Sequence, residues 1–528
     1  MTHQQIEKLK EPETFAERPD KVEIIQTHMS VVCLAGERVY KFKKHIELPF
    51  ADFSTLEKRR EFCELELHLN RRLCPDIYLE VVPLVEDPDG RLRFVPDGEG
   101  KTDGGETIDY AVRMQRLPTE RMLDVLLEEE DGVSRQEIRG IASRMVEFHR
   151  TARRDEAVKE LGSPDKLREF AMNNFEQTRS MADDLFAATL HAALEKRTAD
   201  DFEQFADLLA ARADKGFAVE GHGDLHARNI CMTDPPAIYD CIEFNPGFRC
   251  ADVAAEHAFL VMDLRFRGHA ELADVYLDAV IEKSGDAKIR RLMPMLVRYR
   301  AMIRAKVAAI AIGEREMPEK ERHESATEAR RYLRLAGATT VEDKAPIWIL
   351  SCGLPATGKS TLARILAEAP GTAWPLFSSD AVRKNLAGAA RGARLPESYY
   401  TSEFSRRTYD ALYRRAKSAT GDGSVVLLDA NFRSRGERAK ARKAATQCGA
   451  RFVIVEAIAE EATIRSRLAQ RAGDPHATSD ADLMVYEKLK DTFETPQEDE
   501  ADHVFRIDNN DNPEATAEAV LGQLVAGQ

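Results

Sequence analysis

The sequence predicts two folds in succession: a mixed α+β region, then an α/β domain built on a parallel sheet. In residues 22–117, short strand-like runs alternate with turn signals around one amphipathic helix at 54–73, and a largely helical sequence follows to about residue 336. From residue 347 onwards, apolar strand-like runs alternate with helix-like runs. Such alternation is typical of parallel strands joined by crossover helices.

The length of the chain and one short segment predict where the domains divide. A chain of 528 residues is too long for one hydrophobic core, because single cores stop growing at roughly 250–300 residues. Residues 336–346 are small and polar and end at Pro346, a pattern typical of a linker. We therefore expect one domain at 20–335, a linker at 336–346 and a second domain at 347–528.

Composition and charge exclude several classes of protein. With 43% hydrophobic and 32% charged residues, the chain has the composition of an ordinary globular protein. Its formal net charge of -15 would repel a polyanion. A nucleic-acid partner would need a local basic patch, and we interpret the dense basic stretches at 406–415 and 433–443 as solvated helix faces. Nucleic acid is not expected as a partner.

Cysteine usage and hydropathy predict a reduced, cytoplasmic protein. The eight cysteines are scattered, without a Cys-x-x-Cys pair or a histidine at zinc spacing. The first 21 residues are charged throughout, and no run of about 18 apolar residues occurs. We expect no membrane partner.

The sharpest motif is GLPATGKST, which directly follows the apolar run at 347–352 and directly precedes a helix-like run. Glycines allow backbone N–H groups to converge on phosphates, and a helix N-terminus adds a favourable dipole. In this motif Lys359 would reach the β- and γ-phosphates and the Ser360 hydroxyl would ligate Mg²⁺. The motif predicts ATP and Mg²⁺ as cofactors, bound by Gly353, Leu354, Pro355, Ala356, Thr357, Gly358, Lys359, Ser360 and Thr361.

Two aspartates stand at the ends of later strands, where open α/β sheets bind their ligands. Asp380 follows the second predicted strand and Asp429 ends the third. Asp380 is a candidate to accept a substrate hydroxyl proton, and Asp429 to hold Mg²⁺ or serve as base. An N-cap of the next helix is an equally good interpretation of Asp380.

Arg467 and Arg471 lie four residues apart on one predicted helix and therefore share a face. Arginines on a movable helix can cover the charge of a transferred phosphoryl group. A solvated helix face is the alternative for each of them.

On these residues, the region from about 346 to 528 resembles the small-molecule P-loop kinases, in particular gluconate-kinase-like, zeta-toxin-like and polynucleotide-kinase-like proteins with an AAA-type ATP-binding domain. The resemblance implies transfer of the ATP γ-phosphate to a hydroxyl. Lys359, Ser360, Asp380 and the two arginines would then have the roles given above.

A second constellation lies in the first domain. The segment HGDLHARN places Asp224 and Asn229 five residues apart, and a later strand delivers Asp240. Phosphoryl transfer needs a carboxylate to accept the proton of the attacking hydroxyl and oxygen ligands for Mg²⁺. Asp224 suits the first task, and Asn229 and Asp240 suit the second. The alternative is a loop whose aspartate is satisfied locally.

This constellation resembles the aminoglycoside phosphotransferase family over residues 20–335. The resemblance implies a two-lobed, protein-kinase-like fold with a β-rich ATP-binding lobe over a helical lobe. It assigns Lys41 to the phosphates, Glu66 to an ion pair with that lysine, and Met114 to the hinge near adenine.

Rival residues and departures from the family pattern leave alternatives open. Glu64 competes with Glu66, and Lys43 and Lys44 compete with Lys41. No Gly-x-Gly-x-x-Gly loop precedes Lys41, and Asp240 is not followed by Phe-Gly.

We therefore predict a bifunctional ATP-dependent phosphotransferase (kinase) that acts on hydroxyl groups of small molecules, with one site per domain. One alternative is a P-loop ATPase or kinase whose first domain only binds or regulates. The other is polynucleotide kinase activity in the second domain.

Overall fold

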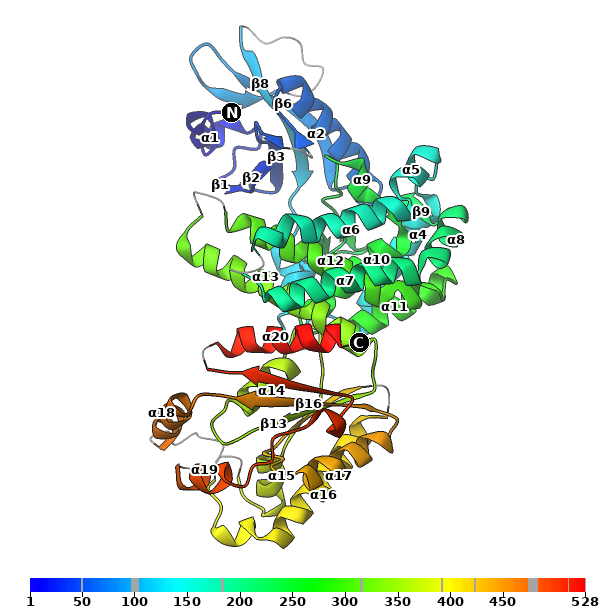
Figure 1. Cartoon of the computed structure of the whole chain (residues 1–528). Coiled ribbons are helices and arrows are strands. Elements are labelled where there is room, and N and C mark those ends of the chain that lie inside the picture. Colours follow the sequence, from blue (N-terminus) through cyan, green and yellow to red (C-terminus); the bar gives the residue numbers. More distant parts are fainter. Residues whose placement is uncertain are drawn as a thin grey trace. The chain divides into compact units, whose positions relative to one another are not determined.

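The computed structural model describes residues 1–48, 51–95, 104–181, 185–313, 317–390, 393–421, 424–472, 483–510 and 512–527, without the side chains of 471 and 472. The chain divides into two compact units, and Figure 1 gives the labels of their helices and strands. Unit 1 consists of Met1–Leu167, Phe205–Leu264 and Glu271–Met293. Unit 2 consists of Arg168–Gln204, Arg265–Ala270 and Pro294–Gln528. Each unit is described by itself.

The helices begin where the local sequence provides caps. Ser134 and Glu137 form a capping box at the start of α4, and Asn512 with Pro513 starts α20. The α-helices in chain order are α1 (His3–Lys8), α2 (Leu56–Arg71), α3 (Leu123–Leu126), α4 (Arg135–Thr151), α5 (Glu156–Leu161), α6 (Pro164–Thr178), α7 (Ala188–Gln204), α8 (Ala206–Asp214), α9 (Pro246–Arg249), α10 (Val253–Phe266), α11 (Ala270–Ser284), α12 (Ile289–Ala311), α13 (Glu319–Glu342), α14 (Lys359–Ala367), α15 (Ser379–Leu386), α16 (Ser402–Ala419), α17 (Arg435–Thr446), α18 (Glu461–Ala472), α19 (Leu483–Lys490) and α20 (Pro513–Ala526).

Unit 1 contains an antiparallel sheet in the order β1-β2-β3-β8-β6-β7. Its strands are β1 (Val22–Gln26), β2 (Ser30–Ala35), β3 (Arg38–Lys43), β6 (Tyr78–Glu86), β7 (Leu92–Phe94) and β8 (Glu106–Gln115). Successive side chains of a strand point to opposite faces. Tyr40 and Phe42 of β3 join an apolar cluster on one face, so Lys41 and Lys43 belong to the other face, which α2 covers.

Helix α2 confirms the predicted amphipathic helix at 54–73 and places a carboxylate in the interior. Thr55 caps it by accepting a hydrogen bond from the Lys58 amide. Its inward face carries Cys63, Glu66 and Leu69, and Glu66 is completely buried. A buried carboxylate needs partners, because an unpaired buried charge is costly.

The rest of unit 1 contains short strand pairs: β4 (Glu47–Leu48) with β5 (Ala51–Asp52), β9 (Ala218–Glu220) with β12 (Cys250–Asp252), and β10 (Ile230–Cys231) with β11 (Ala237–Ile238). The loop at 221–229 leaves β9 and enters β10. It carries the HGDLHARN segment.

Unit 2 contains the predicted parallel sheet. Its strands are β13 (Ile347–Cys352), β14 (Leu376–Ser378), β15 (Val425–Asp429), β16 (Arg451–Ile458) and β17 (His503–Asp508), in the order β14-β15-β13-β16-β17. Asp429 pairs in register with Ser351 on one side and Ser378 on the other. The carboxyl ends of β13, β14 and β15 therefore meet at one edge.

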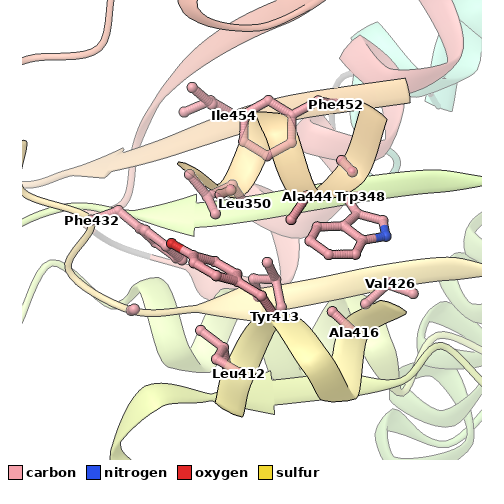
Figure 2. Close-up of a cluster of buried hydrophobic side chains, with 14 of the residues drawn as sticks. Trp348, Leu350, Leu412, Tyr413, Ala416, Val426, Phe432, Ala444, Phe452 and Ile454 are labelled. Carbon is pink, nitrogen blue, oxygen red and sulfur yellow. The ribbon is translucent and has the colours of Figure 1, made fainter. Parts of the chain in front are cut away.

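An apolar cluster fills the space between one face of this sheet and helices α16 and α17 (Figure 2). Alternate residues of β13, Trp348 and Leu350, pack against Leu412 and Ala444 of these helices. The indole nitrogen of Trp348 donates to Thr420 Oγ1 at 2.8 Å, which satisfies its buried N–H.

The opposite face is covered by α14 and α20, and α20 packs in turn on α7 and α13. Gly522 of α20 permits close contact, because a Cβ there would lie 2.7 Å from the Leu190 amide nitrogen. Helices α7 and α13, which the sequence placed in the first domain, thus belong to the compact unit of the parallel sheet.

The predicted end of the helical sequence at about residue 336 is wrong, because α13 continues to Glu342, inside the segment interpreted as a linker. The small residues Ala336, Gly337 and Ala338 are buried against neighbouring helices rather than exposed in a turn. Small side chains serve close helix packing as well as loops, and this caused the error. The domain limits of 20–335 and 347–528 stay predictions.

Within the described ranges, no helix has both the length and the apolar character needed to cross a membrane.

Candidate active sites

The loop at 221–229 in unit 1 brings Asp224 and Asn229 together. The Asn229 amide nitrogen donates to Asp224 Oδ2 at 3.1 Å and to the Asp224 main-chain oxygen at 3.0 Å. The imidazole Nε2 of His226 lies 3.2 Å from the same Asp224 oxygen. Both hydrogen bonds use the Asn229 amide nitrogen, so its side-chain oxygen takes part in neither of them.

Helix α10 holds this loop through two buried carboxylates. Glu256 Oε1 accepts from the amides of His222 at 2.5 Å and Gly223 at 2.6 Å. Seven residues on, Asp263 Oδ2 accepts from the Ala227 amide at 2.8 Å. The backbone is therefore fixed on both sides of Asp224. Sequence reasoning missed both carboxylates, because acidic residues inside an apolar helix carry no local signal of their partner.

The other oxygen of Glu256 lies 2.5 Å from His149 Nε2 of α4. Burial alone would raise the pKa of Glu256, but His149 and the backbone donors outweigh it and lower the pKa to about 2. Gly221 leaves the necessary space, since a Cβ there would lie 2.4 Å from Glu256 Oε2.

Lys41 lies between Glu66, the partner that the family resemblance assigned to it, and Asp240, the predicted metal ligand. Its Nζ is 2.8 Å from Glu66 Oε1 and 2.5 Å from Asp240 Oδ1. Glu64, the rival of Glu66, pairs instead with Arg60 on the exposed face of α2. Geometry therefore favours Glu66 as the partner of Lys41.

Lys43, which competed with Lys41 on sequence grounds, is bound to the same glutamate. Its Nζ is 2.5 Å from Glu66 Oε2 and also pairs with Glu243. The Lys43 side chain is 2% exposed, against 15% for Lys41. Lys41 is thus the more accessible of the two lysines.

Electrostatics keep Glu66 and Lys41 charged. Burial alone would raise the pKa of Glu66, but Lys41 and Lys43 outweigh it and lower the pKa to about 2. Burial opposes the charge of Lys41, yet Asp240 and Glu66 raise its pKa well above the usual range. Burial raises the pKa of Glu243, which Lys43 only partly offsets.

The remaining features of the predicted nucleotide lobe lie along the sheet. Met114, the predicted hinge residue, is buried at the end of β8, opposite Val39 and Tyr78. The AGER turn joins β2 to β3, whereas the turn between β1 and β2 spans residues 27–29 and has no glycine.

In unit 2, the GLPATGKST segment forms the loop from β13 into α14. Gly353 (φ 143°) and Gly358 (φ 86°) adopt conformations that favour glycine. A Cβ would lie 2.5 Å from the Ala457 carbonyl oxygen at Gly353 and 2.1 Å from Asn509 Nδ2 at Gly358. Both glycines are thus required by backbone conformation and by space.

The side chains of Asn509 and Arg467 hold this loop by hydrogen bonds to backbone carbonyl oxygens. Asn509, at the end of β17, donates to the Thr357 carbonyl at 2.9 Å. Arg467 of α18 donates to the carbonyl oxygens of Ala356 at 3.3 Å, Asn509 at 2.8 Å and Asn510 at 3.0 Å. The role of Arg467 in covering a phosphoryl group stays a prediction, and it would require the guanidinium to leave these carbonyls. The Arg471 side chain lies outside the described residues.

Asp429 ends β15 beside the loop lysine. It interacts with the hydroxyls of Ser360 and Ser378, and burial raises its pKa, opposed by Lys359. Among the described residues, its buried Oδ1 has no hydrogen-bond partner. Hydroxyl and carboxylate oxygens are ligands that Mg²⁺ prefers, so Ser360 and Asp429 fit the cation expected there.

Asp380 lies in the first turn of α15. The interpretation of Asp380 as an N-cap is wrong, because Ser378 occupies that position. Asp380 is also close enough to raise the pKa of Asp429. The two carboxylates that the sequence singled out thus belong to one site, together with Lys359.

Comparisons with known proteins match the two regions of the chain that contain these sites. Residues 54–292 match the model of the phosphotransferase enzyme family, and residues 349–496 match that of an AAA domain. Uncharacterized proteins of Mycobacterium bovis and Mycobacterium tuberculosis are 30% identical over 458 residues, which is 86% of this chain and 86% of each relative.

Two solved structures illustrate the likeness of the two regions. An amicoumacin kinase in complex with AMP-PNP is 13% identical, covering 63% of this chain and 96% of its own, with a TM-score of 0.35. A gluconokinase from Sinorhizobium meliloti is 22% identical, covering 34% of this chain and 92% of its own, with a TM-score of 0.25.

The family models confirm the predicted fold class, a kinase-like phosphotransferase region followed by a P-loop domain with a parallel sheet. The chain therefore belongs to the family of these mycobacterial proteins and is an ATP-dependent kinase by type.

Proposed function

We propose that this chain is a bifunctional phosphotransferase that carries ATP γ-phosphates to hydroxyl groups of small molecules, with one site in each unit. The observation that carries the proposal is the same in both units. A lysine for phosphate lies beside a carboxylate suited to a metal ion, Lys41 with Asp240 and Lys359 with Asp429.

In unit 1, Asp224 is the proton acceptor. The acceptor hydroxyl oxygen attacks the γ-phosphorus, its proton passes to the Asp224 carboxylate, and the bond to the β–γ bridging oxygen breaks to release ADP. Asn229 holds Asp224 in place through its amide nitrogen, while Lys41 neutralises phosphate charge. Met114 would contact the adenine at the hinge.

In unit 2, the glycine loop cradles the phosphates by its backbone N–H groups and Lys359 contacts the transferred group. Asp380 accepts the proton of the acceptor hydroxyl from the first turn of α15. When bound, Mg²⁺ would neutralise charge that develops on the β- and γ-phosphates. Asn229 and Asp240 would hold it in unit 1, and Ser360 and Asp429 in unit 2.

Two alternatives differ in what supports them. The glycine-free turn at 27–29 favours a first domain that only binds or regulates, but Asp224, Asn229 and Asp240 have no evident use in such a domain. Polynucleotide kinase activity finds less support in the described residues of α17. Three of its five basic side chains pair with an acidic segment, as Arg435–Asp499, Arg438–Glu500 and Arg442–Asp502.

The test is transfer of labelled γ-phosphate from ATP to a panel of small hydroxyl compounds. Each product is then assayed with Asp224→Asn and with Lys359→Met. The proposal expects some products to vanish only with the first change and others only with the second. Asp214→Asn and Lys440→Met, which alter exposed residues, serve as matched controls. If neither site variant changes the turnover of any product, the proposal fails.

A further inference from the structure

Five charged side chains of unit 1 form a chain of alternating sign. Each of the two Glu66 oxygens receives one lysine, Lys41 at 2.8 Å and Lys43 at 2.5 Å. Each lysine then contacts one further acid on the segment at 240–243. The order of this charge network is Asp240, Lys41, Glu66, Lys43 and Glu243.

The network closes on itself, because its two ends lie three residues apart in the sequence. It thereby ties together β3, α2 and the segment after β11. One half, the Lys41–Asp240 contact, joins groups that the proposed reaction must separate so that each can engage nucleotide or metal. The other half, Lys43 with Glu243, joins groups that the reaction does not use.

Burial separates the two halves in the same way. The side chains of Lys43 and Glu243 are 2% and 6% exposed, whereas that of Asp240 is 42% exposed. The network carries three acids and two lysines. Asp240 is the acid that an incoming cation can reach, because Glu66 and Glu243 are buried.

We infer that Lys43 and Glu243 are positioning residues: their buried pair anchors the segment at 240–243 to β3, so that Asp240 can exchange Lys41 for a metal ion while its backbone stays in place. This inference rests on the proposed nucleotide site of unit 1. It also accounts for the second lysine of β3, which a single phosphate-binding lysine does not require.

The backbone of Asp240 supports the need for an anchor. Asp240 has φ 63°, a left-handed conformation that non-glycine residues seldom adopt without support from their surroundings. Its amide donates to the Tyr78 hydroxyl at 3.2 Å, and the Cys241 amide donates to Asn70 Oδ1 at 2.9 Å. Glu243 supplies the charged contact that closes this set.

The experiment measures binding of a nonhydrolysable ATP analogue by calorimetry, with saturating Mg²⁺ and with EDTA. A Lys359→Ala parent removes the unit 2 site. In that parent, Glu243→Gln keeps the size of the side chain and the Lys43–Glu66 pair. Loss of a residue that orients a metal ligand typically costs about 10- to 100-fold in metal affinity. We expect the gain in analogue affinity from Mg²⁺ to fall by about that factor, with a smaller change in EDTA.

Three further variants separate positioning from stability. Lys43→Met leaves Glu243 unpaired and should reduce the Mg²⁺-dependent gain in analogue affinity most. The double variant Lys43→Met, Glu243→Gln should recover part of that gain. Lys43→Arg keeps the charge and should retain most of the Mg²⁺ effect. The half-buried pair of Lys8 and Glu86 in the same unit, changed to Met and Gln, is the matched control and should leave binding unchanged.

Each outcome decides a different question. The inference would be overturned if a folded Glu243→Gln protein gained as much analogue affinity from Mg²⁺ as the parent does. It would also be overturned if the variant lost as much analogue affinity in EDTA as in Mg²⁺. No analogue binding at all in the Lys359→Ala parent would overturn the proposed function of unit 1, and the inference with it.

Discussion

Replacement of Glu256 by Gln tests how firmly the loop that carries Asp224 is held. Glu256 is 4% exposed and accepts hydrogen bonds from two loop amides and from His149. Gln has nearly the same shape, and its oxygen can stay on the loop amides. The substitution therefore removes the charge and little else.

The pKa gives the size of the effect. Lowering the pKa of Glu256 from 4.5 to about 2 corresponds to about 3 kcal/mol, at roughly 1.4 kcal/mol per pKa unit. Because the folded-state pKa is depressed, this stability is present above about pH 4.5 and is lost as the pH falls towards 2. Glu256→Gln should thus lower the free energy of unfolding of unit 1 by about 3 kcal/mol at pH 7, and the difference should shrink at acid pH.

The assay exploits the position of the two tryptophans. Trp348 and Trp374 are the only ones in the chain, and both lie in unit 2. During unfolding in urea, tryptophan fluorescence reports the unfolding of unit 2. Circular dichroism reports both units, so the part of its change that has no counterpart in fluorescence reports unit 1. Glu147→Gln, which alters an exposed residue of α4, is the control. A Glu256→Gln protein whose unit 1 is as stable as wild type at pH 7 would refute the reasoning.

The remaining predictions concern unit 2. Burial raises the pKa of Glu518 to about 6, although the charge of Arg334 lowers it. The folded state therefore favours the protonated form, and stability falls as the pH rises through 6. Glu518→Gln should raise the free energy of unfolding by about 2 kcal/mol at pH 8 and leave it unchanged below pH 4.5, as measured by tryptophan fluorescence. Arg438→Met should lower the free energy of unfolding by about 3–5 kcal/mol, because it leaves the buried carboxylate of Glu500 unpaired. The ion pair of Arg435 is exposed, so equal stability of Arg438→Met and Arg435→Met would contradict this prediction. Gly358→Ala should abolish one nucleotide site in calorimetry, because the new Cβ would lie 2.1 Å from Asn509 Nδ2. Unchanged binding would show that the loop adapts to the added methyl group.

The features that the sequence predicted best are those encoded within a few residues. The glycine loop is one, because Gly353 and Gly358 specify their own backbone conformation and the strand and helix around them are contiguous. The Asp224 and Asn229 pair is another, since a five-residue spacing within one loop suffices to bring the side chains together.

Features that depend on packing between distant segments were harder to predict. Sequence spacing identified Lys41 and Lys43 as rivals, but only the sheet register and α2 show that both bind Glu66. The partners of Glu256 and Asn509 lie far away in the chain, so neither residue carried a signal. The end of the helical sequence was predicted too early, at about residue 336, because the small residues at 336–342 suit a turn and a helix interface equally well.

The most direct test of two kinase sites is to count nucleotide sites. A nonhydrolysable ATP analogue with Mg²⁺ is titrated by calorimetry into the wild type, Lys359→Ala and Lys41→Ala. Two sites in the wild type, falling to one in each variant, is the predicted result. One site in the wild type that disappears with Lys359→Ala and persists with Lys41→Ala would contradict it, and would leave unit 1 without a nucleotide.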